Sequence, residues 1–251
     1  MEMTTTLLDQ PDGNYRFLPN GGKTPYSCGA IAARGYEIVH ATLRQPLRWR
    51  DGFAFIAHHL ASIDRPRAAL CAIELRGAKP YRPDQWLGPG TFNQEYIDLI
   101  ASWGLFVGTE NPVARTNVSP GVNAPSEQVL FAFSYTVPAG DDAPPTFVVA
   151  GSGEVPDVRR GETSPDALRE KTRDVMNTMR TRLSALGGRW EDVTAVDVYT
   201  VHDFTSFLIP EILEPIGSAT RWGIHWYYSR PPIDDREVEI DLRGVRQEIQ
   251  L

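Results

Sequence analysis

The same order of predicted elements occurs twice along the chain, and this repeat constrains the fold more than any other feature. Each half reads strand, helix, strand, helix, strand, strand, with roughly 115 residues between equivalent elements. The halves meet at PAGDDAPP (138–145), where prolines, a glycine and two acids separate apolar runs. We therefore predict an α+β fold of two tandem domains, 1–137 and 138–251, each a mixed, mainly antiparallel sheet covered by two helices.

Three helices are predicted from the spacing of their apolar residues, and a fourth is expected to start at 204–209, where Pro210 interrupts or kinks it. WRDGFAFIAHHLASI (49–63) and FNQEYIDLIASW (92–103) both carry apolar residues at helical spacing. The segment 164–186 is the clearest helix, because Ser164 caps its start and the pair Gly187-Gly188 follows its end. Its apolar residues form one buried stripe.

The first residues are predicted from their polarity and turn signals. The segment up to Lys23 is polar, and we expect it to be loose. PYSCGAIAARGYEIVHATL (25–43) is typical of a β-hairpin that turns at Ala33-Arg34-Gly35. We expect this hairpin to open the sheet of the first domain.

Composition excludes several function classes. Of 251 residues 41% are apolar, and the net charge is −7, so a general nucleic-acid binder or an anionic-membrane binder is not expected. No apolar run reaches the ~18 residues of a membrane span, and the acidic N-terminus lacks the layout of a signal peptide. Cys28 and Cys71 make no disulfide framework and no metal-ligand spacing. We expect a cytoplasmic protein without a metal.

The stretch ATRWGIHWYYSRPPIDDREVEIDL near the C-terminus is the most informative about a site. It reads as two strands joined by PPIDD, so Arg221, Gly223 and His225 share one face of the first strand. Glu239 and Asp241 share one face of the second strand, with apolar residues on the other face. Buried charges are costly without partners, so these groups on adjoining strands are consistent with a pocket. They are equally consistent with a structural ion pair or with solvated edge charges.

The second half resembles the Rid/YjgF family of reactive-intermediate deaminases, also called endoribonuclease L-PSP. The matching pieces occur in family order: VAGSGEVP, the helix ending LSALGG, WEDVTAVDVYTVHDFTSF, the arginine of ATRW and the closing REVEIDL. The first half resembles the family more weakly, through TPY (24–26), LCAIELRG, FNQEYIDLI and NPVART. The resemblance implies two tandem YjgF/chorismate-mutase-like domains, an arrangement similar to that of the chorismatase-like enzymes.

The family hydrolyses enamines and imines of small carboxylic acids, including 2-iminoacids, 2-aminoacrylate and 2-aminomuconate, and needs no cofactor. By position, the resemblance implies that Arg221 grips the substrate carboxylate and that Glu239 positions water or moves a proton. Arg115 falls at the equivalent arginine of the first half. Tyr26 matches the aromatic residue that the family sends into a neighbouring subunit's pocket. The resemblance also implies a homotrimer with sites at domain or subunit interfaces.

Several positions depart from the family pattern. Gly223 stands where a small residue such as cysteine is usual, so the pocket has more room. His225 has no family counterpart, and it either tunes substrate choice or is a core histidine. The aromatic residues around it suit a ring or a conjugated dienoate, or else belong to the core or an interface. Leu130 and Ala132 stand where the first half would need carboxylates, so we expect the second half to supply the chemistry.

Three functions follow from these residues. The first is a deaminase of an enamine or imine acid of the 2-aminomuconate or iminoacid type, in aromatic or amino-acid catabolism. The second is a lyase or mutase acting on an aromatic or cyclic carboxylate, and the third is a non-catalytic ligand-binding or assembly module. The acidic net charge argues against a ribonuclease. The predicted catalytic residues are Arg221 and Glu239, and the predicted substrate-binding residues are Tyr26, Arg115, Gly223, His225 and Asp241.

Overall fold

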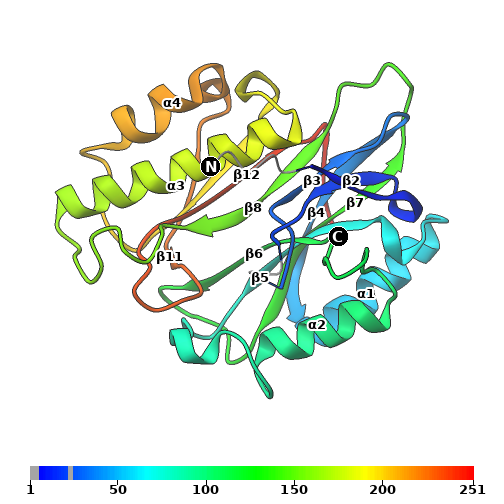
Figure 1. Cartoon of the computed structure of the whole chain (residues 1–251), viewed down its shortest axis with the longest axis horizontal. Coiled ribbons are helices and arrows are strands. Elements are labelled where there is room, and N and C mark those ends of the chain that lie inside the picture. Colours follow the sequence, from blue (N-terminus) through cyan, green and yellow to red (C-terminus); the bar gives the residue numbers. More distant parts are fainter. Residues whose placement is uncertain (1–5, 22–24) are drawn as a thin grey trace.

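Two twisted β-sheets form the centre of the molecule, and helices cover the outer face of each, as Figure 1 shows. The computed structural model describes residues 6–21 and 25–251. The two sheets pack against each other through their inner faces, which gives four layers. The predicted α+β class is confirmed.

The seven-stranded sheet runs, edge to edge, through β1 (Leu8–Gln10), β2 (Tyr15–Leu18), β3 (Gly29–Ala32), β8 (Phe147–Gly153), β12 (Glu239–Gly244), β9 (Ala195–Tyr199) and β10 (His225–Tyr227). The six-stranded sheet runs through β11 (Ser229–Arg230), β6 (Ala114–Pro120), β5 (Leu70–Arg76), β7 (Val129–Pro138), β4 (Tyr36–Arg48) and β13 (Gln247–Gln250). The helices are α1 (Trp49–Ser62), α2 (Phe92–Ser102), α3 (Pro165–Leu186) and α4 (Glu214–Ile216). The first two cover the six-stranded sheet, and the last two cover the seven-stranded sheet.

The three predicted helices are confirmed to within a residue or two. The cap of α3 is formed as expected, because Ser164 Oγ accepts a hydrogen bond of 3.3 Å from the backbone N–H of Ala167. Gly187 ends the helix with a φ of 81°, a left-handed conformation that glycine adopts without strain. The helix therefore begins and ends where its sequence signals lie.

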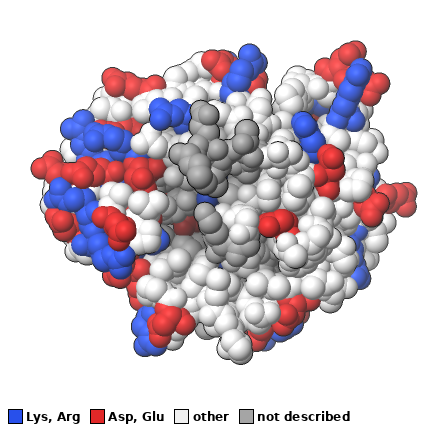
Figure 2. Space-filling view, viewed as in Figure 1, with Lys and Arg blue, Asp and Glu red and all other residues white. Residues whose placement is uncertain are grey.

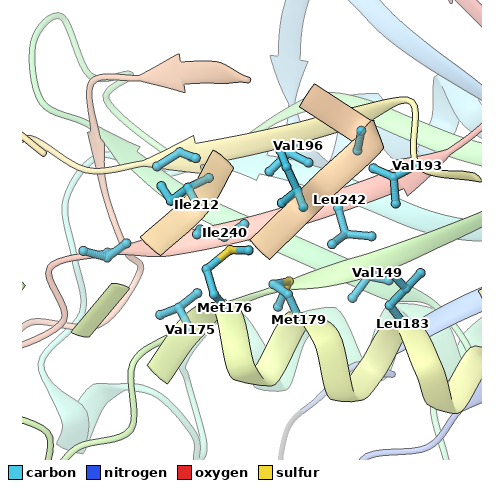
Figure 3. Close-up of a cluster of buried hydrophobic side chains, with 14 of the residues drawn as sticks. Val149, Val175, Met176, Met179, Leu183, Val193, Val196, Ile212, Ile240 and Leu242 are labelled. Atoms are coloured by element: carbon cyan, nitrogen blue, oxygen red, sulfur yellow. The ribbon is translucent and has the colours of Figure 1, made fainter. Parts of the chain in front are cut away.

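The apolar stripe of α3 packs on β12 and its neighbours. Figure 3 shows Val175, Met179 and Leu183 directed toward Ile240 and Leu242. All five side chains are at most 2% exposed, and each such buried side chain contributes about 1.5–3 kcal/mol. This packing fixes the face of β12 that turns away from the helix, which is the face that carries the charged residues.

The two halves exchange terminal strands. β1, β2 and β3 come from the first half but join the seven-stranded sheet, where β3 pairs with β8. The last strand, β13, comes from the second half and pairs with β4 in the six-stranded sheet. Each predicted domain thus supplies most of one sheet and lends strands to the other, which ties the halves together.

The exchange corrects two predictions for the N-terminal residues. The 25–43 segment is not a hairpin, because β3 and β4 lie in different sheets and the chain crosses between them at Ala33–Gly35. All four residues of β3 are buried, so β3 needs strand neighbours on both edges, which a local hairpin would not provide. The segment predicted to be loose includes the strands β1 and β2. Its residues 1–5 and 22–24, including Thr24 of the TPY motif, lie outside the described residues.

The C-terminal stretch also differs from its prediction. β10 pairs in parallel with β9 at His225 and Asp197, whereas β12 pairs antiparallel with β9 at Glu239 and Tyr199. The strand β9 therefore lies between the two strands that were predicted to adjoin. The alternation within β12 is confirmed: its acids face the six-stranded sheet, while Ile240 packs under α3.

The outer surface carries charges of both signs. Figure 2 shows acidic and basic side chains interspersed on the face it presents, in place of a continuous basic area. Nucleic-acid binding without sequence preference depends on such a basic area. Among the residues that the structure describes, no helix has the length and apolar character to cross a bilayer.

Candidate active site

Glu239 is the first residue of β12, and its side chain is directed between the two sheets, where the residue is 3% exposed. Burial raises the pKa of its carboxyl group to about 8, although the nearby Arg182 and Arg115 act in the opposite direction. A backbone hydrogen bond from Asn117 on β6 also reaches this carboxyl group. A carboxyl group with such a pKa exchanges protons near neutral pH, which suits a general acid and base.

The backbone of β8 leaves room for this carboxyl group because residue 151 is glycine. A Cβ atom on Gly151 would overlap Oε1 of Glu239 and would lie 3.0 Å from Oγ1 of Thr116. Thr116 Oγ1 in turn accepts a hydrogen bond of 3.1 Å from the backbone N–H of Gly151. The close approach of strands β6 and β8 thus depends on this glycine.

Arg115 lies on β6, and its side chain is enclosed by aromatic rings. The guanidinium carbon is 4.6 Å from the ring centroid of Tyr26, 4.8 Å from that of Tyr96 and 5.5 Å from that of Trp86. Nη2 donates a hydrogen bond of 2.7 Å to Asn93 Oδ1. Nε and Nη1 are buried and have no hydrogen-bond partner in the described part of the chain. Buried donors without partners are rare, and two on one guanidinium group indicate a place for an anion.

A cleft of about 170 Å³ is lined by Glu239 and by two of the aromatic residues that enclose Arg115. At ~30 Å³ for each water molecule, this volume corresponds to about six waters, and a small organic acid would occupy a similar volume. The first half contributes Tyr26 and Trp86, both in contact with Arg115, and the second half contributes Glu239 and two further arginines. The lining residues are Tyr26, Trp86, Gly151, Ser152, Gly153, Arg182, Pro231, Pro232, Ile233, Arg236 and Glu239. The cleft therefore lies between the halves, where small-molecule sites are common.

Arg221 lies apart from this cleft, which corrects the prediction that it shares a strand face with Gly223 and His225. It is exposed on a 3-10 helix (Gly217–Trp222), and Nη2 donates a hydrogen bond of 2.9 Å to the backbone oxygen of Glu191. The strand prediction fails because Gly223 has a φ of 73°, which interrupts the extended backbone. The regular strand β10 begins only at His225.

His225 and Asp241 belong to a layer of charged side chains between and beside the sheets. Nδ1 of His225 is 2.7 Å from Oδ1 of Asp197, and this contact raises the pKa of the histidine. Oδ2 of Asp197 accepts a hydrogen bond of 2.6 Å from Arg243. Asp241 accepts one hydrogen bond of 2.5 Å from Thr116 and one of 3.1 Å from Tyr199. His225 thus forms an ion pair, but with Asp197 on β9 and not with the acids of β12 that the sequence had suggested.

Three buried carboxylates of this layer lie within 4.8 Å of one another: Glu74, Asp197 and Asp241. Such a group has the composition of a divalent-cation site. Each carboxylate already has a protein partner, since Glu74 is 3.2 Å from Arg76 and the other two bond as described above. These partners explain the burial of the carboxylates without an ion.

Comparison with known proteins is decisive for the family. The family model described as 2-aminomuconate deaminase CnbZ matches residues 7–249. The chain belongs to this deaminase family. A relative, the 2-amino-5-chloromuconate deaminase of Comamonas testosteroni, is 35% identical over 249 residues. These residues are 95% of this chain and 96% of the relative.

Solved structures resemble this member of the deaminase family more distantly. A chorismatase is 12% identical, with a TM-score of 0.43 over 87% of this chain and 77% of its own. A cyanuric acid hydrolase is 10% identical, with a TM-score of 0.42 over 86% of this chain and 69% of its own. The Escherichia coli YjgF protein is 18% identical, with a TM-score of 0.25 over 41% of this chain and 81% of its own.

Three residues of the site in this family member were not predicted from the sequence: Trp86, Arg182 and Arg236. Arg182 had a signal, because it follows Met179 by three residues and so lies beside the buried stripe of α3. A cation in that position needs a partner, and its Nη1 donates 2.9 Å to the backbone oxygen of Ala150. The other two lie in irregular loops, where no periodicity indicates a direction.

Proposed function

We propose that this protein is a hydrolytic, cofactor-independent deaminase of a 2-aminomuconate-type acid in the breakdown of aromatic compounds, and that the reaction takes place in the cleft between the halves. The observation that carries the proposal is that a protonatable Glu239 lies within electrostatic range of Arg115, whose Nε and Nη1 have no hydrogen-bond partner among the described residues. The family match and the chloromuconate deaminase relative supply the substrate class.

In this proposal Arg115 binds the carboxylate next to the carbon that bears nitrogen. Its Nε and Nη1 lie on different edges of the guanidinium plane, and each has a hydrogen-bond donor available for an anion. Tyr26 and Trp86 cover the guanidinium group and exclude water, which strengthens the charged contact. Arg115 thus takes the role that the resemblance had assigned to Arg221.

Glu239 moves the protons. The protonated carboxyl group donates its proton to the enamine carbon, and the C–N bond becomes an iminium. Water then adds to the iminium carbon and loses one proton to the Glu239 carboxylate. That proton passes to nitrogen, ammonia leaves as the C–N bond breaks, and the hydroxyl proton returns to Glu239 as the carbonyl forms. The sum is enamine plus water giving a keto acid and ammonia, and the pKa of about 8 suits both directions of transfer.

Ammonia release from 2-aminomuconate tests this function. The wild-type protein should release one ammonia for each substrate consumed, without added metal or coenzyme. Glu239→Gln keeps the size of the side chain but cannot exchange a proton, and it should lower kcat by about 100-fold or more with little change in KM. Loss of the substrate without ammonia would indicate a lyase or mutase instead.

We also propose that the protein is cytoplasmic and assembles as a homotrimer. The free thiols of Cys28 and Cys71 and the exposed Trp222, Trp226 and Tyr228, each about half exposed, support these two statements. Light scattering on the purified protein should give a mass near three times the 28.0 kDa of the chain. A stable species of one chain mass at micromolar concentration would contradict the assembly.

A further inference from the structure

A second arginine, Arg236, faces the cleft without a partner for part of its charge. Its Nη1 is buried and has no hydrogen-bond partner among the described residues, and Arg236 lines the same cleft as Glu239. Like Arg115, Arg236 thus has a buried guanidinium nitrogen without a hydrogen-bond partner. Arg115 lies on β6, whereas Arg236 lies in the loop before β12. A buried guanidinium nitrogen directed into a cleft is a place for an anion.

Two acids that act electrostatically on Arg236, Glu154 and Asp174, form hydrogen bonds or ion pairs with other groups. Glu154 lies 3.3 Å from Lys171 Nζ and accepts backbone hydrogen bonds from Glu237 and Val238. Asp174 accepts a hydrogen bond of 2.8 Å from the backbone N–H of Val155. Among the described residues no carboxylate forms a salt bridge with Arg236, so its buried Nη1 keeps a donor for a ligand.

The turn that carries Arg236 is held in place by the first half. The backbone N–H of Tyr81 donates 2.7 Å to the oxygen of Pro232, and the N–H of Asp234 donates 2.8 Å to the oxygen of Tyr81. The N–H of Arg236 itself donates 3.2 Å to the oxygen of Ile233. A guanidinium group on such a fixed turn is preorganised, so little entropy is lost when it binds an anion.

Glu239 lines the cleft together with Arg236, and Arg115 interacts with it electrostatically. Its carboxyl group receives a hydrogen bond from the backbone of Asn117, two residues after Arg115 on β6, while Arg236 precedes it by three residues in the chain. Both arginines interact electrostatically with this carboxyl group. The reacting group of the proposed mechanism thus lies within electrostatic range of two arginines that each have a nitrogen without a hydrogen-bond partner among the described residues.

We infer that Arg236 binds the second carboxylate of a linear dicarboxylic acid and thereby makes the site selective for dicarboxylates over monocarboxylates. The inference rests on the proposed function, in which Arg115 holds the carboxylate beside the reacting carbon. A 2-aminomuconate-type substrate carries its other carboxylate at the far end of a six-carbon chain. Arg182 is a weaker candidate, because its Nη1 is bonded to the backbone oxygens of Ala150 and Gly151 and none of its nitrogens is a buried donor without a partner.

The test compares two ligands that differ in one carboxylate. Muconate and sorbate share an unsaturated six-carbon chain, but only muconate has an acid at both ends, and calorimetry measures both affinities without turnover. The wild-type protein should bind muconate about 10–100-fold more tightly than sorbate, the range expected for a hydrogen-bonded charged contact. Arg236→Gln should remove this preference by weakening muconate binding alone, and Arg236→Lys should restore part of it.

Arg160→Gln is the matched control. Arg160 lies near enough to Arg236 to affect it electrostatically, but it is paired with Asp157 at 3.1 Å outside the cleft. This variant removes one nearby positive charge and should retain the muconate preference within about threefold. Equal weakening of both ligands in Arg236→Gln, or an equal affinity for both in the wild type, would overturn the inference.

Turnover separates the inference from the function on which it rests. In Arg236→Gln the kcat/KM for 2-aminomuconate should fall about 10–100-fold, mainly through KM, while that for the monocarboxylate 2-aminoacrylate should stay unchanged. If the wild type binds muconate selectively but releases no ammonia, the proposed deaminase function is wrong and the dicarboxylate site stands. If it releases ammonia equally well from both substrates and Arg236→Gln changes neither rate, the dicarboxylate site is wrong and the function stands.

Discussion

Asn93 Oδ1 lies 2.7 Å from Nη2 of Arg115 and accepts its hydrogen bond, which leaves Nε and Nη1 as the donors available for a substrate. The amide of Asn93 also donates 2.5 Å to the backbone oxygen of Trp86, whose ring lies over the same guanidinium group. One residue of α2 thus positions both the cation and part of its cover.

Replacement of Asn93 should therefore loosen Arg115. In Asn93→Ala we expect KM for 2-aminomuconate to rise about tenfold. We also expect a stability loss of ~1–3 kcal/mol, because Nη2 of Arg115 would be left unpaired. Asp98→Ala, on the exposed face of the same helix, should leave both quantities unchanged. Steady-state kinetics and thermal unfolding of the two variants make the comparison. An unchanged KM in Asn93→Ala would show that Arg115 is held without it.

Gly151 should not tolerate a side chain. The added Cβ of Gly151→Ala would overlap Glu239 Oε1, so the carboxyl group must move, and we expect kcat to fall at least tenfold with a stability cost of about 1–3 kcal/mol. Gly140→Ala is the matched control, because its Cβ would meet no atom within 4 Å. If Gly151→Ala has the activity of the control, Glu239 does not act from its observed position.

Glu239 should make the stability of the fold fall as pH rises. Its folded-state pKa of about 8 lies above the ordinary value of ~4.3, so the folded protein binds the proton more tightly than the unfolded chain does. The contribution is complete below about pH 4.3 and is lost as pH rises through about 8. The Tm of Glu239→Gln minus the Tm of the wild type should therefore be larger at pH 8 than at pH 5. The same difference in Tm at both values would contradict a raised pKa.

Asp197 should contribute in the opposite pH direction. Burial alone would raise the pKa of its carboxyl group, but Arg243 and His225 hold it down at about 2. Its stabilising effect is present above the ordinary pKa of ~3.9 and is lost as pH falls toward 2. Asp197→Asn leaves Arg243 without its buried partner and should cost about 3–5 kcal/mol at pH 7 in urea unfolding.

The control for Asp197 is Asp192→Asn, which breaks a pair with the largely exposed Arg189 at 3.2 Å. Exposed pairs contribute little, so this change should cost less than ~1 kcal/mol. A similar cost for both substitutions would mean that the buried pair of Asp197 on β9 with Arg243 on β12 contributes no more than an exposed pair.

The alternation of β12 could be predicted from the sequence because it is local. Ile240 packs under α3 while Glu239 turns toward the other sheet, as a two-residue period requires. The position of Arg221 could not be predicted in this way, because the positive φ of Gly223 ends the strand pattern that its neighbours suggest. Aromatic and branched residues alone do not distinguish an extended segment from a 3-10 helix.

The strand exchange was also beyond local signals. β3 and β4 are separated by a turn that has the composition of a hairpin, yet they join different sheets because burial on both sides of β3 decides its partners. For the same reason, the sequence placed Arg115 in one half and Glu239 in the other without indicating that they meet. Their electrostatic interaction depends on how the two sheets pack.

The most direct test of the account compares two charge-conserving substitutions, Arg115→Lys and Arg221→Lys, in ammonia release from 2-aminomuconate. Lysine keeps the positive charge but cannot provide the guanidinium donors that remain when Asn93 holds Nη2. With folding verified by circular dichroism, Arg115→Lys should lower kcat/KM by about 100-fold, and Arg221→Lys should stay within about threefold of the wild type. A large loss in Arg221→Lys with normal turnover in Arg115→Lys would contradict a site between the halves.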